Sequence, residues 1–205
     1  MNKKQIVHAQ KPTVWDLSNQ ILYNLCREHP EHTDDSIIIT KIMMIGRIYS
    51  AAIERRKKQS VKGDDFYIKN VAPIIRKSSI DKEIQRLSGF KHPDQSNLAV
   101  ILEVHKYVME LFKRISGLEK RSLASKYLHF HKPDLFYIYD SRAKKGMRRF
   151  ANSNTKLFNM EKLNHYDKEY TDFLIKCILL NEVLGKKHRK CLNPREIDNL
   201  LIGCS

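Results

Sequence analysis

The sequence has little cysteine and little glycine, and each scarcity narrows what the protein can be. Its 205 residues include four cysteines, which lie far apart and form no Cys-x-x-Cys pair. Zinc sites and iron–sulfur clusters normally use such paired spacings, so neither is expected, and the thiols are expected to be free. The seven glycines and six prolines form no repeat or low-complexity tract. We therefore predict no metal ion and no other cofactor.

Long apolar runs are also missing. No stretch approaches the ~20 apolar residues that a membrane-spanning helix needs. The first residues, Met1 to Gln5, lead into polar residues and not into the apolar segment of a secretory signal. We therefore expect a cytoplasmic, monomeric protein with no membrane partner.

Strand-type alternation is nearly absent, whereas apolar residues recur at helical spacing along the whole chain. The first strong pattern begins at Thr13, ends before Pro30 and predicts Trp15 and Tyr23 in the core. Further helices are predicted after the cap residues 34–36 and at 66–75, 81–87, 94–116, 166–184 and 194–201. With 41% hydrophobic residues, the chain should form one all-α, two-lobed domain of about nine or ten helices over residues 1–205.

Several helix ends are predicted from local residues. The second helix should end in the basic turn Arg55 to Lys58, where cations suit the helix dipole. Gly117 should end the long helix, in which His105 is expected to be a core histidine. Gly185 should end the helix that starts near residue 166, and Asn193 should cap the last one, with Pro194 at its first position. A polar stretch at 152–156 is expected to be a loop.

The charge balance is strongly basic. Lys and Arg number 38 against 23 Asp and Glu, which gives a formal net charge of +15. An excess of this size on a folded chain is typical of proteins that bind a polyanion, because cations release counterions from phosphates. Membrane lipid or a ribosome would attract the same charge, so the charge alone does not identify the polyanion.

One stretch, 112–151, combines features that suggest chemistry. A turn at Gly117 leads to an apolar helical segment, Pro133 breaks it, and the apolar run Leu135 to Tyr139 ends at Asp140. A basic helix follows that acid. Asp140 is therefore either a helix cap or a catalytic carboxylate.

This order of elements resembles the helix-hairpin-helix DNA glycosylase superfamily. The segment Leu123 to Leu128 is similar to the second helix of the family's hairpin, with the hairpin-like element near 112–130, and Phe136 to Ser141 is similar to the segment that carries the catalytic aspartate. The resemblance implies an enzyme that flips a damaged or modified base out of duplex DNA and hydrolyses its N-glycosidic bond.

The resemblance also implies roles for particular residues. Asp140 would stabilise the oxocarbenium-like sugar, and Lys120, 20 residues earlier, or Ser122 would complete the catalytic set, the lysine as a nucleophile in a lyase reaction. The predicted nucleic-acid contacts are Gly117, Arg121, Lys126, Arg142, Lys144, Lys145 and Arg148. The predicted base-stacking rings are Tyr127, Phe130 and Tyr139.

Two alternatives stay open. Glu119 stands where the family has a second hairpin glycine, so the chain could be a non-catalytic DNA-binding protein in which Asp140 only caps a helix. Arg27-x-x-x-x-His32 matches the spacing of HEPN-type RNA nucleases, although Pro30 interrupts it. The sequence does not specify the base, the presence of lyase activity, or a role in DNA repair or in defence.

Overall fold

The computed structural model describes residues 3–58, 65–150, 158 and 160–203, and within them it contains ten α-helices and no β-strand. This confirms the all-α prediction. The helices are α1 (Lys3–Ala9), α2 (Val14–Glu28), α3 (Asp35–Ile48), α4 (Ala72–Arg76), α5 (Ile80–Gln85), α6 (Leu98–Ser116), α7 (Arg121–His131), α8 (Ser141–Met147), α9 (Lys168–His188) and α10 (Pro194–Gly203). A π-helical turn, Tyr67–Val71, precedes α4, and 3-10 turns occupy Arg148–Phe150 and Met160–Leu163. Residue 151 and the predicted loop at 152–156 lie outside the described residues.

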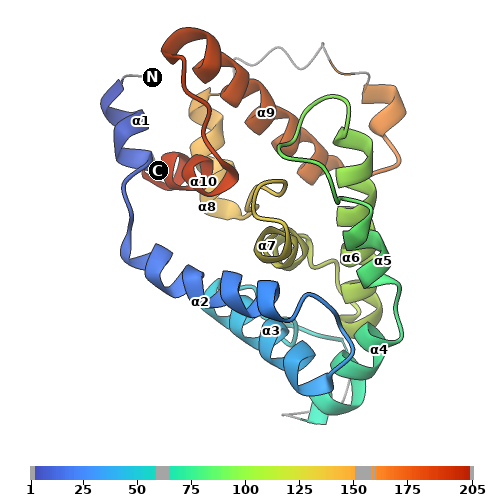
Figure 1. Ribbon diagram of the computed structural model, residues 1–205. Helices are drawn as coiled ribbons and strands as arrows, with labels where there is room; N and C mark the ends of the chain where they lie inside the picture. Colours follow the sequence, from blue (N-terminus) through green and yellow to red (C-terminus); the bar gives the residue numbers. More distant parts are fainter. Residues whose placement is uncertain (1–2, 59–64, 151–157, 159, 204–205) are drawn as a thin grey trace.

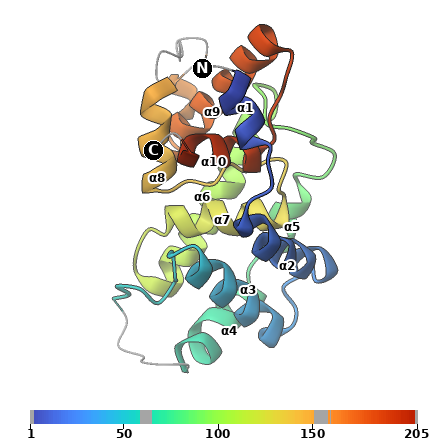
Figure 2. The ribbon, with the colours of Figure 1, turned by 90° about the vertical axis from the view of Figure 1, so that its left-hand side faces the viewer.

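Helix α7 lies in the middle of the molecule. Figure 1 shows it end-on, and Figure 2 shows it between a group formed by α2, α3 and α4 and a group formed by α1, α8, α9 and α10. The two groups form the predicted two lobes. Helix α1 packs against α10, so the first and last helices meet within one lobe.

The central position of α7 explains its unusual burial. All residues from Leu123 to Phe130 are buried, so the helix is enclosed on every side and its polar side chains need partners. Ser125 Oγ accepts a hydrogen bond from the Tyr139 backbone N–H at 3.0 Å. The His129 ring nitrogen Nδ1 lies 2.8 Å from the Phe136 carbonyl oxygen. These bonds hold the segment that leads to Asp140 against α7.

Most helix ends agree with the sequence predictions. The Asp34 carboxylate caps α3 by accepting from the Ser36 backbone N–H at 2.7 Å, and the Asn193 side chain caps α10 by accepting from the Glu196 N–H at 2.8 Å. Gly117 ends α6 with a left-handed φ of 74°, which glycine adopts without strain.

Two predicted helix ends are wrong. Helix α3 ends at Ile48 and does not reach the basic turn at 55–58, because Ser50 turns left-handed (φ 52°) and the Ala51 N–H donates back to the Gly46 carbonyl at 2.7 Å. Helix α9 continues through Gly185 to His188, and its left-handed terminal residue is Arg189 (φ 52°). In both cases a non-glycine residue adopts the conformation that ends the helix.

The apolar face of α2 is more exposed than its periodicity predicts. Trp15 is 52% exposed, so its predicted place in the core is wrong. It lies on the same stripe as the buried Leu22 and Cys26, but at this end of the helix the stripe borders a cavity and not a neighbouring helix. Tyr23 is partly buried against the core, and His105 is buried and stacks on Tyr170 at 3.6 Å between ring centroids, which confirms a core histidine.

Two further findings concern the described residues only. None of their helices combines the length and apolar composition of a bilayer span. Cys26, Cys177 and Cys191 are free thiols, as predicted. The fourth cysteine, Cys204, lies outside the described residues.

Candidate active site around Asp140

Asp140 is both a helix cap and one partner of an ion pair. Its Oδ1 accepts from the backbone N–H groups of Arg142 at 3.0 Å and Ala143 at 2.9 Å, which caps α8. Its other oxygen, Oδ2, lies 3.3 Å from Lys126 Nζ. The Asp140 side chain is 23% exposed. One oxygen therefore holds the helix, while the other faces a lysine and remains within reach of a ligand.

Lys126 comes from the buried helix α7 and is only 2% exposed. Besides Asp140, its ammonium lies 3.0 Å from Ser122 Oγ and 3.2 Å from the Tyr49 carbonyl oxygen. Burial lowers the pKa of Lys126, and the adjacent Asp140 carboxylate opposes that shift. The amine therefore does not lie on the outer surface, where the predicted contact with a backbone phosphate would place it, but on the wall of a cavity.

A cavity of about 660 Å³ opens beside this pair. We call it the Asp140 cavity, and α2, α3, α7, α8 and α10 contribute to its wall. Its lining includes Thr13, Trp15, Ile48, Tyr49, Arg55, Ser122, Lys126, Tyr139, Asp140, Arg142, Arg195, Asp198 and Asn199. The volume falls within the ~300–1,000 Å³ typical of ligand sites. Apolar side chains and several charges line it together, which suits an aromatic polar ligand.

Helix α10 adds a second set of charges to the cavity wall. Arg195 pairs with Asp198 Oδ2 at 2.6 Å and, through its Nε, with Asp16 Oδ1 at 2.8 Å. Asp198 is buried, and its Oδ1 has no hydrogen-bond partner among the described residues. Burial raises the pKa of Asp198 to about 7, although Arg195 opposes the shift. A partly protonated carboxyl therefore lies on the wall of the same cavity as Asp140.

Sequence reasoning missed Arg195 and Asp198. The only indication was an aspartate next to the apolar positions Ile197, Leu200 and Leu201 of an amphipathic helix, three residues after an arginine. That spacing places Arg195 and Asp198 side by side. It does not reveal that α10 brings them to a segment far away in the chain.

Of the two residues predicted to complete the catalytic set, only Ser122 lines the Asp140 cavity. Lys120 instead points toward the segment after α3, where its Nζ donates to the carbonyl oxygens of Arg55 at 2.7 Å and Ala52 at 3.4 Å. Burial lowers the pKa of Lys120 as well. The lysine beside Asp140 is thus Lys126, six residues later in the chain than the spacing predicted.

The turn at Gly117 is covered by the chain. A Cβ at Gly117 would lie 3.0 Å from Lys58 Cβ, and the Lys58 N–H donates to the Ser116 carbonyl at 3.0 Å. Arg121 forms two hydrogen bonds with Asp167, at 2.5 and 2.7 Å. These contacts contradict the predicted phosphate grip by Gly117 and Arg121, because both are already occupied within the protein.

The predicted stacking rings also need correction. Tyr127 and Phe130 are buried in the core, and Tyr127 OH bonds with His32, so neither ring faces the Asp140 cavity. Tyr139 does line the cavity, with its hydroxyl donating to Glu169. Trp15 contributes a half-exposed indole ring to the cavity wall.

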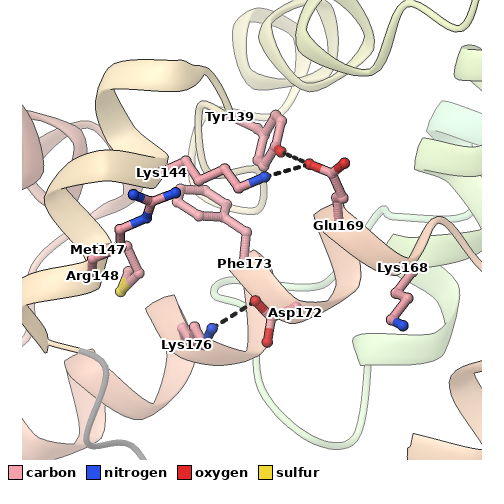
Figure 3. A pocket seen from close by; sticks show the side chains of 9 residues that line it. All are labelled: Tyr139, Lys144, Met147, Arg148, Lys168, Glu169, Asp172, Phe173 and Lys176. Carbon is pink, nitrogen blue, oxygen red and sulfur yellow. Dashed lines mark hydrogen bonds and ion pairs between the residues drawn. The ribbon is translucent and has the colours of Figure 1, made fainter.

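The basic residues of α8 and of the 3-10 turn that follows it lie at the surface, as a contact with phosphate requires. Arg142 lines the Asp140 cavity, and Lys145 and Arg148 are exposed. Lys144 is half-exposed and pairs with Glu169 at 2.7 Å. On the side of α8 that faces α9, a smaller pocket is lined by both charged and aromatic side chains (Figure 3).

The HEPN-type motif is not assembled. His32 is buried after the end of α2, with its Nδ1 2.5 Å from Asp81 Oδ1 and its Nε2 2.6 Å from Tyr127 OH. Arg27 is exposed and bonds with Asn24 on its own helix. Among the described residues, no three His, Cys, Asp or Glu side chains are grouped closely enough to hold a metal ion.

Comparison with known proteins gives one match. A family model named HI_0787_N, described as an N-terminal domain, matches residues 1–135, which run from α1 to the apolar segment before Asp140. The searches of curated proteins and of solved structures found no match. The description carries no activity, and the match covers about two thirds of the chain. The chain therefore belongs to the HI_0787_N family.

Proposed function

We propose that this chain is a DNA glycosylase-like hydrolase, which cleaves the N-glycosidic bond of a damaged or modified base flipped out of duplex DNA. The observation that carries the proposal is the Asp140 carboxylate on the wall of a 660 Å³ cavity, with Oδ2 3.3 Å from the buried Lys126 amine. Loss of the base leaves positive charge on the sugar, and a carboxylate at that position stabilises it.

The other residues of the cavity suit the same substrate. The Trp15 ring is half-exposed at the wall and offers a surface on which an unpaired base can stack. Arg55 and Arg142 are the cavity's exposed cations, suited to the phosphates of the strand. The net charge of +15 supports binding to DNA in general.

Lys126 gives the proposal a possible second step. A neutral lysine amine can attack the sugar C1′ and displace the base, and opening of the C1′–O4′ bond with a proton delivered to O4′ then gives a protonated Schiff base on the lysine. Burial favours the neutral amine. Lys126 is more deeply buried than Lys120 and lies beside a carboxylate that can accept its proton. If the enzyme has lyase activity, we propose Lys126 as its nucleophile.

The experiment compares the wild type with Asp140→Asn on a panel of lesion-containing duplexes, scoring abasic sites. Asparagine caps helices about as well as aspartate, so α8 should persist while the charge is lost. We expect base release to fall roughly 100-fold or more, as for other lost transition-state contacts, with DNA binding retained. Equal release by both proteins would refute a catalytic role for Asp140.

Borohydride trapping separates the two lysines. A covalent adduct that forms with the wild type and Lys120→Met but not with Lys126→Met supports Lys126 as the nucleophile. Loss of the adduct in Lys120→Met alone would assign the step to Lys120. Absence of any adduct, together with base release, indicates a glycosylase without lyase activity.

A second candidate is a DNA-binding protein without activity. This candidate is favoured by the two hydrogen bonds that Asp140 Oδ1 accepts from the backbone of α8. Capping of the helix explains the position of this oxygen without any catalytic role. The same panel tests it: DNA binding without base release in either the wild type or Asp140→Asn supports the binding protein.

A further inference from the structure

A second pocket lies between α8 and α9, on the other side of α8 from the Asp140 cavity. Its volume is about 250 Å³ (Figure 3). Tyr139, Met147 and Phe173 form its apolar lining, and all three side chains are largely buried. This volume lies below the ~300–1,000 Å³ of drug-sized sites. The pocket can therefore take one small flat group against the Phe173 ring.

The rim of this pocket carries four cations and two carboxylates. The carboxylates are already paired, because Lys144 lies 2.7 Å from Glu169 and Lys176 lies 2.7 Å from Asp172. The other two cations, Arg148 and Lys168, form no ion pair with a described residue. The rim thus has positive charge that no carboxylate of the described chain neutralises.

The two unpaired cations are placed differently. Arg148, from the 3-10 turn after α8, and Phe173, from α9, both line the pocket, whereas Figure 3 shows Lys168 pointing away from the other labelled side chains. A guanidinium beside an aromatic ring can hold the phosphate of a ligand whose flat part lies on that ring. The pocket therefore combines the two contacts that an aromatic base joined to a phosphate requires.

We propose that the pocket between α8 and α9 binds a nucleotide unit, with its base against Phe173 and its phosphate on Arg148. The unit could be a free mononucleotide or part of a polynucleotide. Tyr139 lines both this pocket and the Asp140 cavity. A DNA strand with one base beside Asp140 would thus bring a neighbouring nucleotide to Phe173. Binding of a polynucleotide in this way rests on the proposed function, whereas binding of a free mononucleotide does not.

The test compares Arg148→Ala with Arg149→Ala. Arg149 is the next residue, is also exposed and carries the same charge, but it does not line this pocket. Binding of deoxyadenosine monophosphate and of a short undamaged single-stranded oligonucleotide is measured by calorimetry. We expect Arg148→Ala to weaken binding about tenfold, as for other lost bonds to a charged group, and Arg149→Ala to leave mononucleotide binding unchanged.

A second variant tests the aromatic contact. Phe173→Leu keeps an apolar side chain but removes the ring, and its thermal unfolding shows whether the fold survives. A folded Phe173→Leu protein should also bind more weakly. Weaker binding of both probes supports a mononucleotide site, and weaker binding of the oligonucleotide alone supports a strand contact.

The proposal is overturned if Arg148→Ala binds both probes like Arg149→Ala, or if neither probe binds the wild type. Neither probe contains a lesion and no base is released, so the result does not depend on glycosylase activity. If the protein proves to have no glycosylase activity, the binding measurements would still show whether this pocket binds a nucleotide.

Discussion

At the residue scale, the feature that distinguishes Asp140 from an ordinary cap is the partner of its second oxygen. An N-cap aspartate needs only one oxygen to accept backbone N–H groups, and Asp140 Oδ1 does this alone. Oδ2 faces the buried Lys126 ammonium. A buried lysine without its counter-ion is costly, so this pair also explains how an amine is retained inside α7.

Asp198 is the second carboxyl of the cavity, and its titration can be measured separately. Burial raises its pKa from 3.8 to about 7. Between these values the folded protein holds a proton that the unfolded chain has released, so this residue's contribution to stability falls as pH rises from about 4 to 7. Above about pH 7 the loss is complete and stays constant.

Asp198→Asn should remove this pH dependence, because an amide does not titrate in this range. We expect the stability of the variant, relative to the wild type, to improve steadily as pH rises from 4 to 7, by at most ~1.4 kcal/mol per pH unit. Urea unfolding of both proteins at several pH values measures it. A difference that does not vary with pH would show that the pKa of Asp198 is not raised.

At the element scale, the sequence predicted those helices and helix ends that are determined by residues close together in the chain. Helical periodicity and the cap residues Asp34, Gly117 and Asn193 located most helices and their ends. In both failures a non-glycine residue adopts the left-handed conformation that ends the helix, which residue type alone does not predict. Ser50 ends α3 because the following chain folds back on Gly46, where a Cβ would lie 3.0 Å from Ala52 Cα.

The same limit applies to the candidate site. Asp140 could be located because its role as an acid at the start of a basic helix is local. The residues around Asp140 could not be predicted, because helical periodicity does not specify which face of α7 meets α8 or where α10 packs. The pairing of Lys126 with Asp140, and the place of Asp198 on the same cavity wall, therefore emerged only from the structure. The direction of Lys120, away from the cavity, depends in the same way on the segment after α3.

The contact between α8 and α10 gives a prediction for an element. A Cβ at Gly146 would lie 2.1 Å from the Leu201 carbonyl oxygen, which is backbone and cannot move independently. Gly146→Ala should therefore separate the two helices that carry Asp140 and Asp198, at a cost of about 1–3 kcal/mol or more. Thermal unfolding measures the loss.

Gly185→Ala is the matched control. Gly185 also lies within a helix. A Cβ added there would have Cys191 Sγ as its nearest neighbour, at 3.5 Å, which is an ordinary van der Waals contact. Alanine should stabilise α9 by roughly 0.5–1 kcal/mol because it restricts the unfolded chain. Equal effects of the two substitutions would argue against the close contact between α8 and α10.

At the scale of the whole molecule, three histidines among the described residues are buried, His32, His105 and His129, and the partly buried His131 lies next to His32, with 5.0 Å between ring centroids. Burial lowers the pKa of His105 to about 3 and of His129 to about 4, and lowers those of His32 and His131 as well. In the unfolded chain each would titrate near 6.5. Below that pH the unfolded chain binds protons that the folded protein cannot accept, so these residues make stability fall as pH falls.

The protein should therefore lose stability steadily between about pH 6.5 and 4.5, by up to ~1.4 kcal/mol per pH unit for each histidine. Asp198 acts in the opposite direction, but it is one group against four. Urea unfolding at pH 7.5, 6.5 and 5.5 measures the trend. His129→Gln should reduce the slope because it removes one titrating group. Stability that is constant or rises as the pH falls would mean that the buried histidines accept protons in the folded protein, and that the polar core of α7 opens to water more readily than its burial implies.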